Sequence, residues 1–168
     1  MRWLVIFLFA ISCSSIKKDT PEEKTIYFSG LNSIVGLHEI SDRKTLKNLL
    51  GVDPVQYEWC AAFVNLILNY HEIPGSESVS DSPLLARSFM QWGTEVVIPK
   101  RGDVVILKRG NYSWQGHVGF YYETIVENDK KYYVILGGNQ NDSISYEKFP
   151  VKSVVSIRRW QIIKEEDA

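Results

Sequence analysis

The sequence predicts an α+β fold in which N-terminal helices pack on a five- to six-stranded, mainly antiparallel sheet. Two observations lead to this prediction. Residues 41–93 contain apolar runs with helical start and stop signals, whereas residues 95–160 contain short segments typical of strands. The gaps between those segments have hairpin length, and helices followed by a run of strands are typical of α+β domains.

Length and composition bound the organisation of the chain. At 168 residues and 45% hydrophobic, it can bury one core without disulfides or metal. The net charge of −1, with no basic stripe carrying interleaved aromatics, argues against a nucleic-acid partner. We expect one domain over residues 26–163, acting as a monomer and without a cofactor.

The first residues predict export. Residues 1–12 combine a basic start at Arg2 with a short apolar run, as in a signal peptide, and residues 13–25 form a polar tether. Small residues before Cys13 resemble a bacterial lipoprotein processing site. We expect a lipoprotein anchored at Cys13 and facing the periplasm or cell exterior, with secretion and a retained anchor as the alternatives.

The chain has two cysteines, Cys13 and Cys60. A disulfide between them is the default expectation for an exported protein. If Cys13 carries lipid, however, Cys60 is a spare thiol in an oxidising compartment. It is then either buried or used.

Three helices are expected: residues 42–50, Cys60 to about residues 71–73, and Pro83–Gly93. Asp42 and Gly51 can cap the first helix. Residues 53–56 have the form of a capping box, which would start the second helix at Pro54. We favour a break near residues 56–58, which starts that helix at Cys60.

Six strands are expected in the second half of the chain. Their predicted bounds are Glu95–Ile98, Asp103–Lys108, Val118–Glu123, Lys131–Leu136, Ile144–Phe149 and Val154–Trp160.

Cys60 is the first candidate for chemistry. A thiol at the start of a helix lies near unpaired backbone N–H groups, which favour the thiolate and hence a low pKa. The simpler interpretation is a small apolar core residue, as most unpaired cysteines are.

A nucleophilic thiol needs a base within hydrogen-bond reach. His71 lies on the same helix, roughly 16 Å along at about 1.5 Å per residue, and is excluded. His38 stays possible. His117, in Gly116-His117-Val118-Gly119, begins a strand, and its flanking glycines would let a substrate backbone approach.

The base in turn needs an orienting group, and two amides compete for that role. A two-residue turn at residues 128–129 sets His117 opposite Gln140, whereas a loop one residue longer or shorter sets it opposite Asn139. Register alone leaves both amides open.

Several motifs stand in the order seen in a bacterial and phage family of papain-like cysteine amidohydrolases and peptidases of the CHAP and NlpC type. They are Trp59-Cys60-Ala61-Ala62-Phe63-Val64-Asn65, Leu85-Ala86-Arg87-Ser88-Phe89, Arg101-Gly102-Asp103-Val104-Val105, Gly116-His117-Val118-Gly119-Phe120 and Leu136-Gly137-Gly138-Asn139-Gln140. The resemblance covers roughly residues 36–160. It implies a papain-like fold and a peptidoglycan substrate.

The resemblance also implies the roles of the site residues. Cys60 would be the nucleophile, His117 the base and Asn139 the orienting amide, so that an amide bond is hydrolysed through an acyl-enzyme. Many CHAP enzymes carry a glutamate shortly before the asparagine, where this chain has Gly137-Gly138. Transfer of the acyl group to an amine is a variant with the same residues.

Substrate contacts are expected from Gln56, Trp114 and Gln140. The Cys60 backbone N–H is a candidate oxyanion donor, with Gln56 and Tyr57 near enough to supply another.

The alternative function is a catalytically silent, cell-wall-binding lipoprotein on the same scaffold. Trp92, Trp114 and Tyr112 would then form a groove for sugars. Core packing is the favoured interpretation of Trp59 and Trp92. A metalloenzyme and a serine hydrolase are disfavoured, because ligand spacings and a Gly-x-Ser-x-Gly elbow are missing from the sequence.

Overall fold

The computed structural model describes residue 26, residue 28 and residues 30–161. The expected signal peptide, the lipidation site at Cys13 and the whole tether lie outside the described residues, as do residues 27, 29 and 162–163 of the expected domain. Within the described part, no helix is both long enough and apolar enough to cross a membrane.

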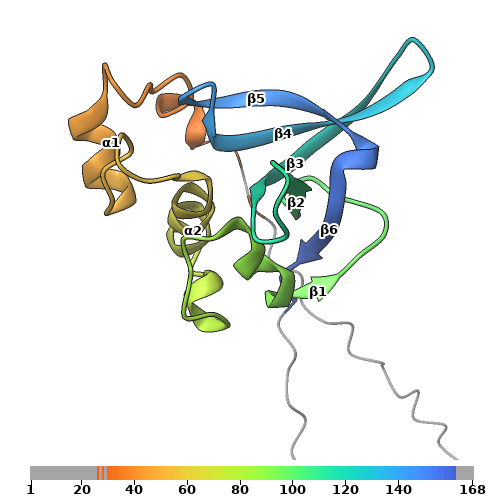
Figure 1. Ribbon diagram of the computed structural model, residues 1–168, viewed down its shortest axis with the longest axis horizontal. Helices are drawn as coiled ribbons and strands as arrows, with labels where there is room; N and C mark the ends of the chain where they lie inside the picture. Colours follow the sequence, from red (N-terminus) through yellow and green to blue (C-terminus); the bar gives the residue numbers. More distant parts are fainter. Residues whose placement is uncertain (1–25, 27, 29, 162–168) are drawn as a thin grey trace, which may run out of the picture.

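The predicted α+β fold is confirmed. Helices α1 (Arg43–Leu50) and α2 (Cys60–Tyr70) lie together beside a six-stranded antiparallel sheet (Figure 1). The strands stand in the order β1-β6-β2-β3-β4-β5. Their bounds are β1 Thr94–Glu95, β2 Val104–Lys108, β3 Gly116–Glu127, β4 Lys130–Gln140, β5 Ser143–Pro150 and β6 Val154–Arg159.

The core has two parts because side chains alternate between the two faces of the sheet. Val104 and Ile106 of β2 belong to the larger cluster, which includes most of α2. Val105 and Leu107 belong to a smaller cluster on the other face. Helix α2 packs against β3 and β4, and its first residue, Cys60, accepts a backbone hydrogen bond from Val118 of β3.

The predicted break before Cys60 is confirmed. Residues 54–56 form a turn, and α2 begins at Cys60 with Trp59 as its N-cap. The carboxylate of Asp53 accepts hydrogen bonds from Arg43 Nε at 2.8 Å and from Lys47 Nζ at 3.2 Å. Asp53 therefore ties the turn to α1 instead of starting a helix.

The predicted helix over Pro83–Gly93 is wrong. The structure has a 3-10 helix, η3, over Ala86–Gln91. The Ser88 N–H and the Ser88 hydroxyl both donate to the Leu85 carbonyl, at 3.0 and 2.7 Å. A short polar side chain that bonds a carbonyl three residues back competes with regular α-helical bonding.

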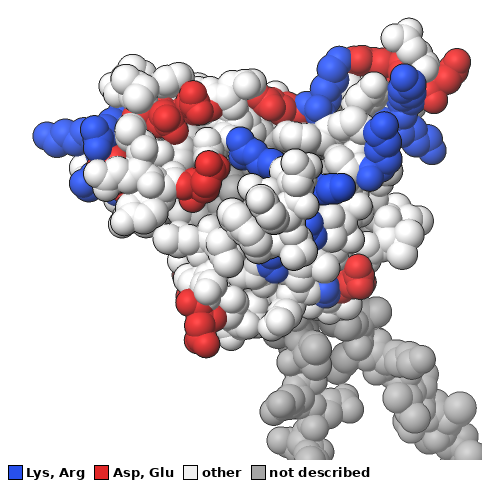
Figure 2. Space-filling view, viewed as in Figure 1, with Lys and Arg blue, Asp and Glu red and all other residues white. Residues whose placement is uncertain are grey.

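The strand predicted over Glu95–Ile98 is present only in its first residue. Val97 and Ile98 are 88% and 80% exposed and lie outside β1. The other strands match their predicted positions, although β3 and β4 are longer than expected. Their hairpin projects beyond the body of the domain (Figure 1), and both basic and acidic side chains lie at this end (Figure 2).

Candidate active site

Cys60 occupies the first position of α2 and is a free cysteine with 3% of its surface exposed. Backbone hydrogen bonds from Val118 and Ala61 reach its thiol. The first N–H groups of a helix have no partner within the helix, so the Cys60 N–H has none inside α2. The thiol is therefore held between the helix start and β3.

The pairing of β3 with β4 ends near this thiol. Paired residues of β3 and β4 begin at Phe120 and Leu136 and run toward the hairpin turn. Val118 lies before this paired region, and its N–H bonds the Cys60 thiol. Cys60 thus contacts the strand residue next to His117 in sequence.

His117 is 3% exposed and packs against Phe149, with ring centroids 5.4 Å apart. Its Nε2 lies 3.0 Å from Gln140 Oε1. An amide oxygen only accepts, so Nε2 carries the proton of the neutral ring and Nδ1 is the basic nitrogen. Nδ1 is buried and has no hydrogen-bond partner among the described residues.

The structure therefore brings Cys60 close to the His117 segment but does not join the two side chains. His117 pairs with Leu107 of β2, whose side chain lies in the smaller core cluster, while Cys60 lies in the larger one. The His117 Nδ1, unpartnered among the described residues, and the buried Cys60 thiol are the two components that a cysteine–histidine pair needs.

Burial governs the protonation of both groups. It raises the pKa of the Cys60 thiol, against the lowering effects of Val118, Arg109 and Ala61. Burial also lowers the pKa of His117 to about 4, although the Gln140 hydrogen bond acts in the opposite direction. The expectation of a low thiol pKa at the helix start is not met, because desolvation outweighs the backbone N–H groups. At neutral pH both groups are uncharged.

The orienting amide differs from the one the family resemblance implied. Gln140, and not Asn139, bonds His117. Asn139 Nδ2 instead donates to Glu58 Oε2 at 2.7 Å. Gln140 is not among the residues that line the Cys60 cleft, and its amide nitrogen donates to the carbonyls of Ser145 and Ile135.

Two irregularities in the sheet act in opposite directions: the first sets Asn139 opposite His117, and the second brings Gln140 back. The expected two-residue turn is present, with Glu127 paired to Lys130, but the register shifts by one residue between Tyr121 and Glu123. Asn139 then adopts a left-handed backbone, with φ of 55°, where the pairing of β4 with β5 also shifts. The bend at Asn139 turns Gln140 toward His117.

The two glycines before Asn139 are required by close packing. A Cβ on Gly137 would lie 2.8 Å from Gln140 Oε1 and 3.3 Å from His117 Nε2. A Cβ on Gly138 would lie 2.6 Å from the Trp59 ring and 2.7 Å from Phe63 Cβ. The chain therefore has no room for the glutamate found there in many CHAP enzymes.

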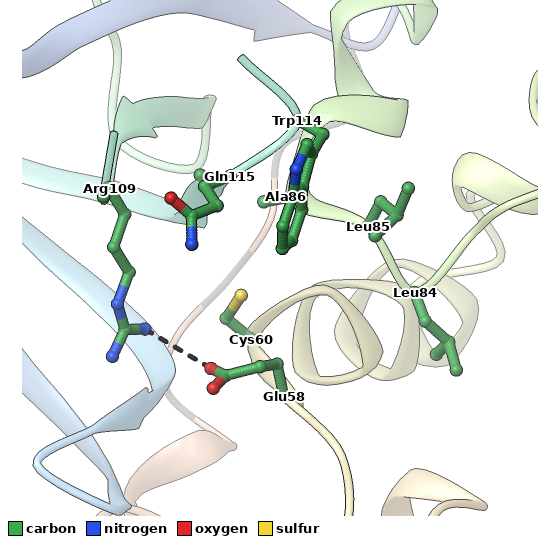
Figure 3. Close-up of a pocket in the computed structure, with 10 residues that line it drawn as sticks. Glu58, Cys60, Leu84, Leu85, Ala86, Arg109, Trp114 and Gln115 are labelled. Carbon is green, nitrogen blue, oxygen red and sulfur yellow. Dashed lines mark ion pairs between the residues drawn. The ribbon is translucent and has the colours of Figure 1, made fainter. Parts of the chain in front are cut away.

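Cys60 opens onto a cleft of about 330 Å³. The residues that line it come from the start of α2, from the segment entering η3, and from the loop between β2 and β3 (Figure 3): Glu58, Cys60, Leu84, Leu85, Ala86, Arg109, Gly110, Trp114, Gln115 and Gly116. Trp114 is 58% exposed and stacks on Tyr112, with ring centroids 6.1 Å apart.

The β2–β3 loop is held in place by Gln115. Its Oε1 accepts hydrogen bonds from the N–H groups of Asn111 and Tyr112, at 2.9 and 3.1 Å. Arg87 Nε donates to the Gln115 carbonyl at 3.0 Å, which joins the loop to η3. The Gln115 amide nitrogen is turned toward the Cys60 side of the cleft (Figure 3).

Other residues singled out in the sequence lie apart from the cleft. Gln56 is exposed, and neither Gln56 nor Tyr57 lines it. The Nδ1 of His38 accepts a hydrogen bond from the Ile40 N–H, and His71 caps the far end of α2. The expected core packing of Trp59 and Trp92 is confirmed, since both are at most 1% exposed.

The comparison with protein families adds to this geometry. The CHAP domain family matches residues 52–139, more than half of the chain. The chain belongs to the CHAP domain family. Among curated proteins and solved structures, none matches it. The matched CHAP region contains Cys60, His117 and the whole lining of the cleft, and it ends at Asn139, one residue before Gln140.

CHAP domains are typically hydrolases that act on peptidoglycan, so the family supports a function of the peptidoglycan-hydrolase type. Sequence reasoning about this CHAP domain missed Glu58, Arg109 and Gln115. Glu58 stands two residues before Cys60, and Arg109 and Gln115 bound the loop before His117. Their charged or amide side chains, close in sequence to Cys60 and His117, are the feature from which a role in the site could have been inferred.

Proposed function

We propose that this CHAP domain is a cysteine-dependent amidase or endopeptidase that hydrolyses an amide bond of peptidoglycan through an acyl-enzyme. One observation carries the proposal. The Cys60 thiol opens onto a cleft and accepts the N–H of Val118, one residue from His117, whose basic Nδ1 has no hydrogen-bond partner among the described residues.

The mechanism starts from two neutral groups. As the Cys60 sulfur attacks the amide carbonyl, its proton passes to His117 Nδ1. His117 then gives this proton to the departing amine, leaving a thioester on Cys60. Water, deprotonated by His117, attacks the thioester and regenerates the thiol. Substrate binding has to bring Nδ1 and the sulfur together, as catalytic hydrogen bonds often tighten only in the complex.

The oxyanion formed on the carbonyl needs donors that are already in place. The free N–H of Cys60 at the helix start is one. We assign the other to the Gln115 side-chain amide, because its oxygen is held by two backbone N–H groups and its nitrogen is turned toward the Cys60 side of the cleft (Figure 3).

Digestion of purified peptidoglycan by the full chain tests this proposal. Mass spectrometry of the new ends would identify the bond cut as sugar–peptide or peptide–peptide. We expect Cys60→Ala and His117→Ala to abolish cleavage while the protein stays folded. Cleavage that survives Cys60→Ala would overturn the assignment of the nucleophile.

A catalytically silent wall-binding protein is the second candidate function. The exposed Tyr112–Trp114 stack favours it, because such rings can stack on sugars. Binding of a glycan fragment would then be weakened by Trp114→Ala but not by the control Tyr70→Ala, whose exposed ring lies at the end of α2. Binding without cleavage of any wall preparation would favour this function over hydrolysis.

We also propose that the protein is exported and lipidated at Cys13. The basic start, the short apolar run and the polar tether of the sequence support this. Intact-mass analysis of membrane fractions would test it. An unprocessed Met1 on a cytosolic protein would exclude export.

A further inference from the structure

The cleft contains one pair of opposite charges among its lining residues. Glu58 lies just before α2, and Arg109 lies at the end of β2, on the opposite wall (Figure 3). Arg109 Nη1 lies 3.7 Å from Glu58 Oε2. The pair spans the cleft beside Cys60.

This ion pair is easily exchanged. The side chains of Glu58 and Arg109 are 78% and 51% exposed. Pairs of this kind contribute little to stability, because water and salt screen them and both side chains lose freedom when they meet. The pair is therefore poorly explained as a structural support.

The two partners differ in how firmly they are held. Glu58 also accepts the 2.7 Å hydrogen bond from Asn139, whose left-handed backbone fixes it at the end of β4. For the Arg109 guanidinium, Glu58 is the one ion-pair or hydrogen-bond partner among the described residues. When the pair opens, Glu58 keeps its place and Arg109 is free to turn.

We propose that Arg109 is the receptor for a carboxylate of the substrate, next to the bond that Cys60 attacks, and that Glu58 occupies this receptor while the cleft is empty. The inference rests on the proposed function and names the substrate class: peptides with a free carboxylate near the scissile amide. A guanidinium suits this role because its N–H groups match a carboxylate in two parallel bonds. Amidation of that carboxylate removes the charge and one acceptor.

The first experiment uses the thiol as a local probe of charge. In the full chain carrying Cys13→Ser, Cys60 is alkylated with anionic iodoacetate and with neutral iodoacetamide, and the ratio of the two rates is measured. Dividing the rates cancels differences in thiol pKa and access. We expect Arg109→Gln to lower the iodoacetate preference by about 3- to 10-fold and Glu58→Gln to raise it, because both charges line the same cleft as Cys60 and a nearby charge acts at this scale.

Matched variants separate a local receptor from general charge. Arg101→Gln removes an exposed guanidinium that lies over Tyr122, away from the cleft, and should leave the ratio unchanged. Arg109→Lys keeps the charge and should keep most of the preference. A ratio that Arg109→Gln does not change would overturn the inference.

The second experiment measures binding, so that failure of catalysis does not decide it. Calorimetry with the Cys60→Ser variant compares one stem peptide with its carboxylate free or amidated. We expect at least about fivefold tighter binding of the free acid, and equal binding of the two peptides once Arg109→Gln is added. Equal binding in the presence of Arg109 would overturn the inference. Selective binding by Cys60→Ser, together with no hydrolysis of the peptide by the chain that keeps Cys60, would support the receptor while rejecting the proposed function.

Discussion

Gln140 Oε1 lies 3.0 Å from His117 Nε2, and this contact fixes which nitrogen of the ring is basic. The amide itself is held by the Ser145 and Ile135 carbonyls, which accept from its nitrogen. The oxygen must therefore face the ring. His117 is left with its proton on Nε2 and its free electron pair on Nδ1.

We expect Gln140→Ala to lower kcat/KM by roughly 10- to 100-fold, a part of the 10²–10⁴ that a positioned base contributes. Asn139→Ala should lower it less, since Asn139 bonds Glu58. Gln140→Glu is the matched variant. A carboxylate beside the ring should raise the pKa of His117 and move the acidic limb of the pH–rate profile upward. An unmoved limb would contradict the assigned contact.

Which of the two amides, Asn139 or Gln140, bonds His117 marks the limit of what the sequence could predict here. The turn at residues 128–129 and the pairing next to it followed from residue types. The extra residue near Tyr122 and the left-handed Asn139 did not, because nothing in their side chains requires a bulge. Each shifts the register by one residue, in opposite directions, so the contact returns to Gln140, the residue that the simple two-residue turn sets opposite His117.

The helices show a similar division. The start of α2 at Cys60 was predictable, although its cause is the use of the Asp53 carboxylate by α1, a contact between elements. The lining of the cleft by Arg109 and Gln115 depends on how the β2–β3 loop folds over Cys60. Loops of this kind take their shape from tertiary contacts such as Arg87 to Gln115.

Cys60 should react slowly with neutral iodoacetamide at pH 7. Burial raises the pKa of the thiol, so the rate should rise with pH and reach its inflection above the free-thiol value of about 8.5. Stopped-flow alkylation of the full chain with Cys13→Ser would measure it. An inflection below pH 7 would instead indicate a thiolate–imidazolium pair in the free enzyme, and His117→Ala should then abolish that inflection.

Gly137→Ala and Gly138→Ala should separate activity from stability. The new methyl at position 137 meets the flexible end of Gln140, so the protein should fold while the His117 contact is displaced and kcat falls. At position 138 the methyl meets the Trp59 ring and the Cβ of Phe63 on α2. A Cβ atom is fixed to the backbone and cannot rotate away. We expect a loss of about 1–3 kcal/mol of unfolding free energy there, typical of overpacking, measured by urea denaturation. Equal effects of the two changes on stability would contradict this division.

Gln115→Glu tests the proposed oxyanion donor with little change of shape. The new carboxylate can still accept the N–H groups of Asn111 and Tyr112, so the loop should keep its fold. The donor is lost, however, and a negative charge faces the developing oxyanion. We expect kcat to fall by roughly 10²- to 10³-fold with KM much less affected. A rise in KM with unchanged kcat would assign Gln115 to substrate binding instead.

The stability of the fold should fall as the pH drops from about 6.5 to about 4. His117 has a pKa of about 4 in the folded protein, below its ordinary value of 6.5, so between these values the unfolded chain binds the proton more readily. Stability is therefore complete above the unfolded pKa and is lost as the pH falls through the folded one, by roughly 3 kcal/mol in total.

Urea denaturation at a series of pH values measures this dependence of the unfolding free energy on pH. His117→Gln, which cannot titrate, should remove most of it. Because the Gln140 hydrogen bond raises the pKa of His117, Gln140→Ala should extend the loss of stability to lower pH and increase its total. A pH dependence that neither variant changes would place the titrating group elsewhere.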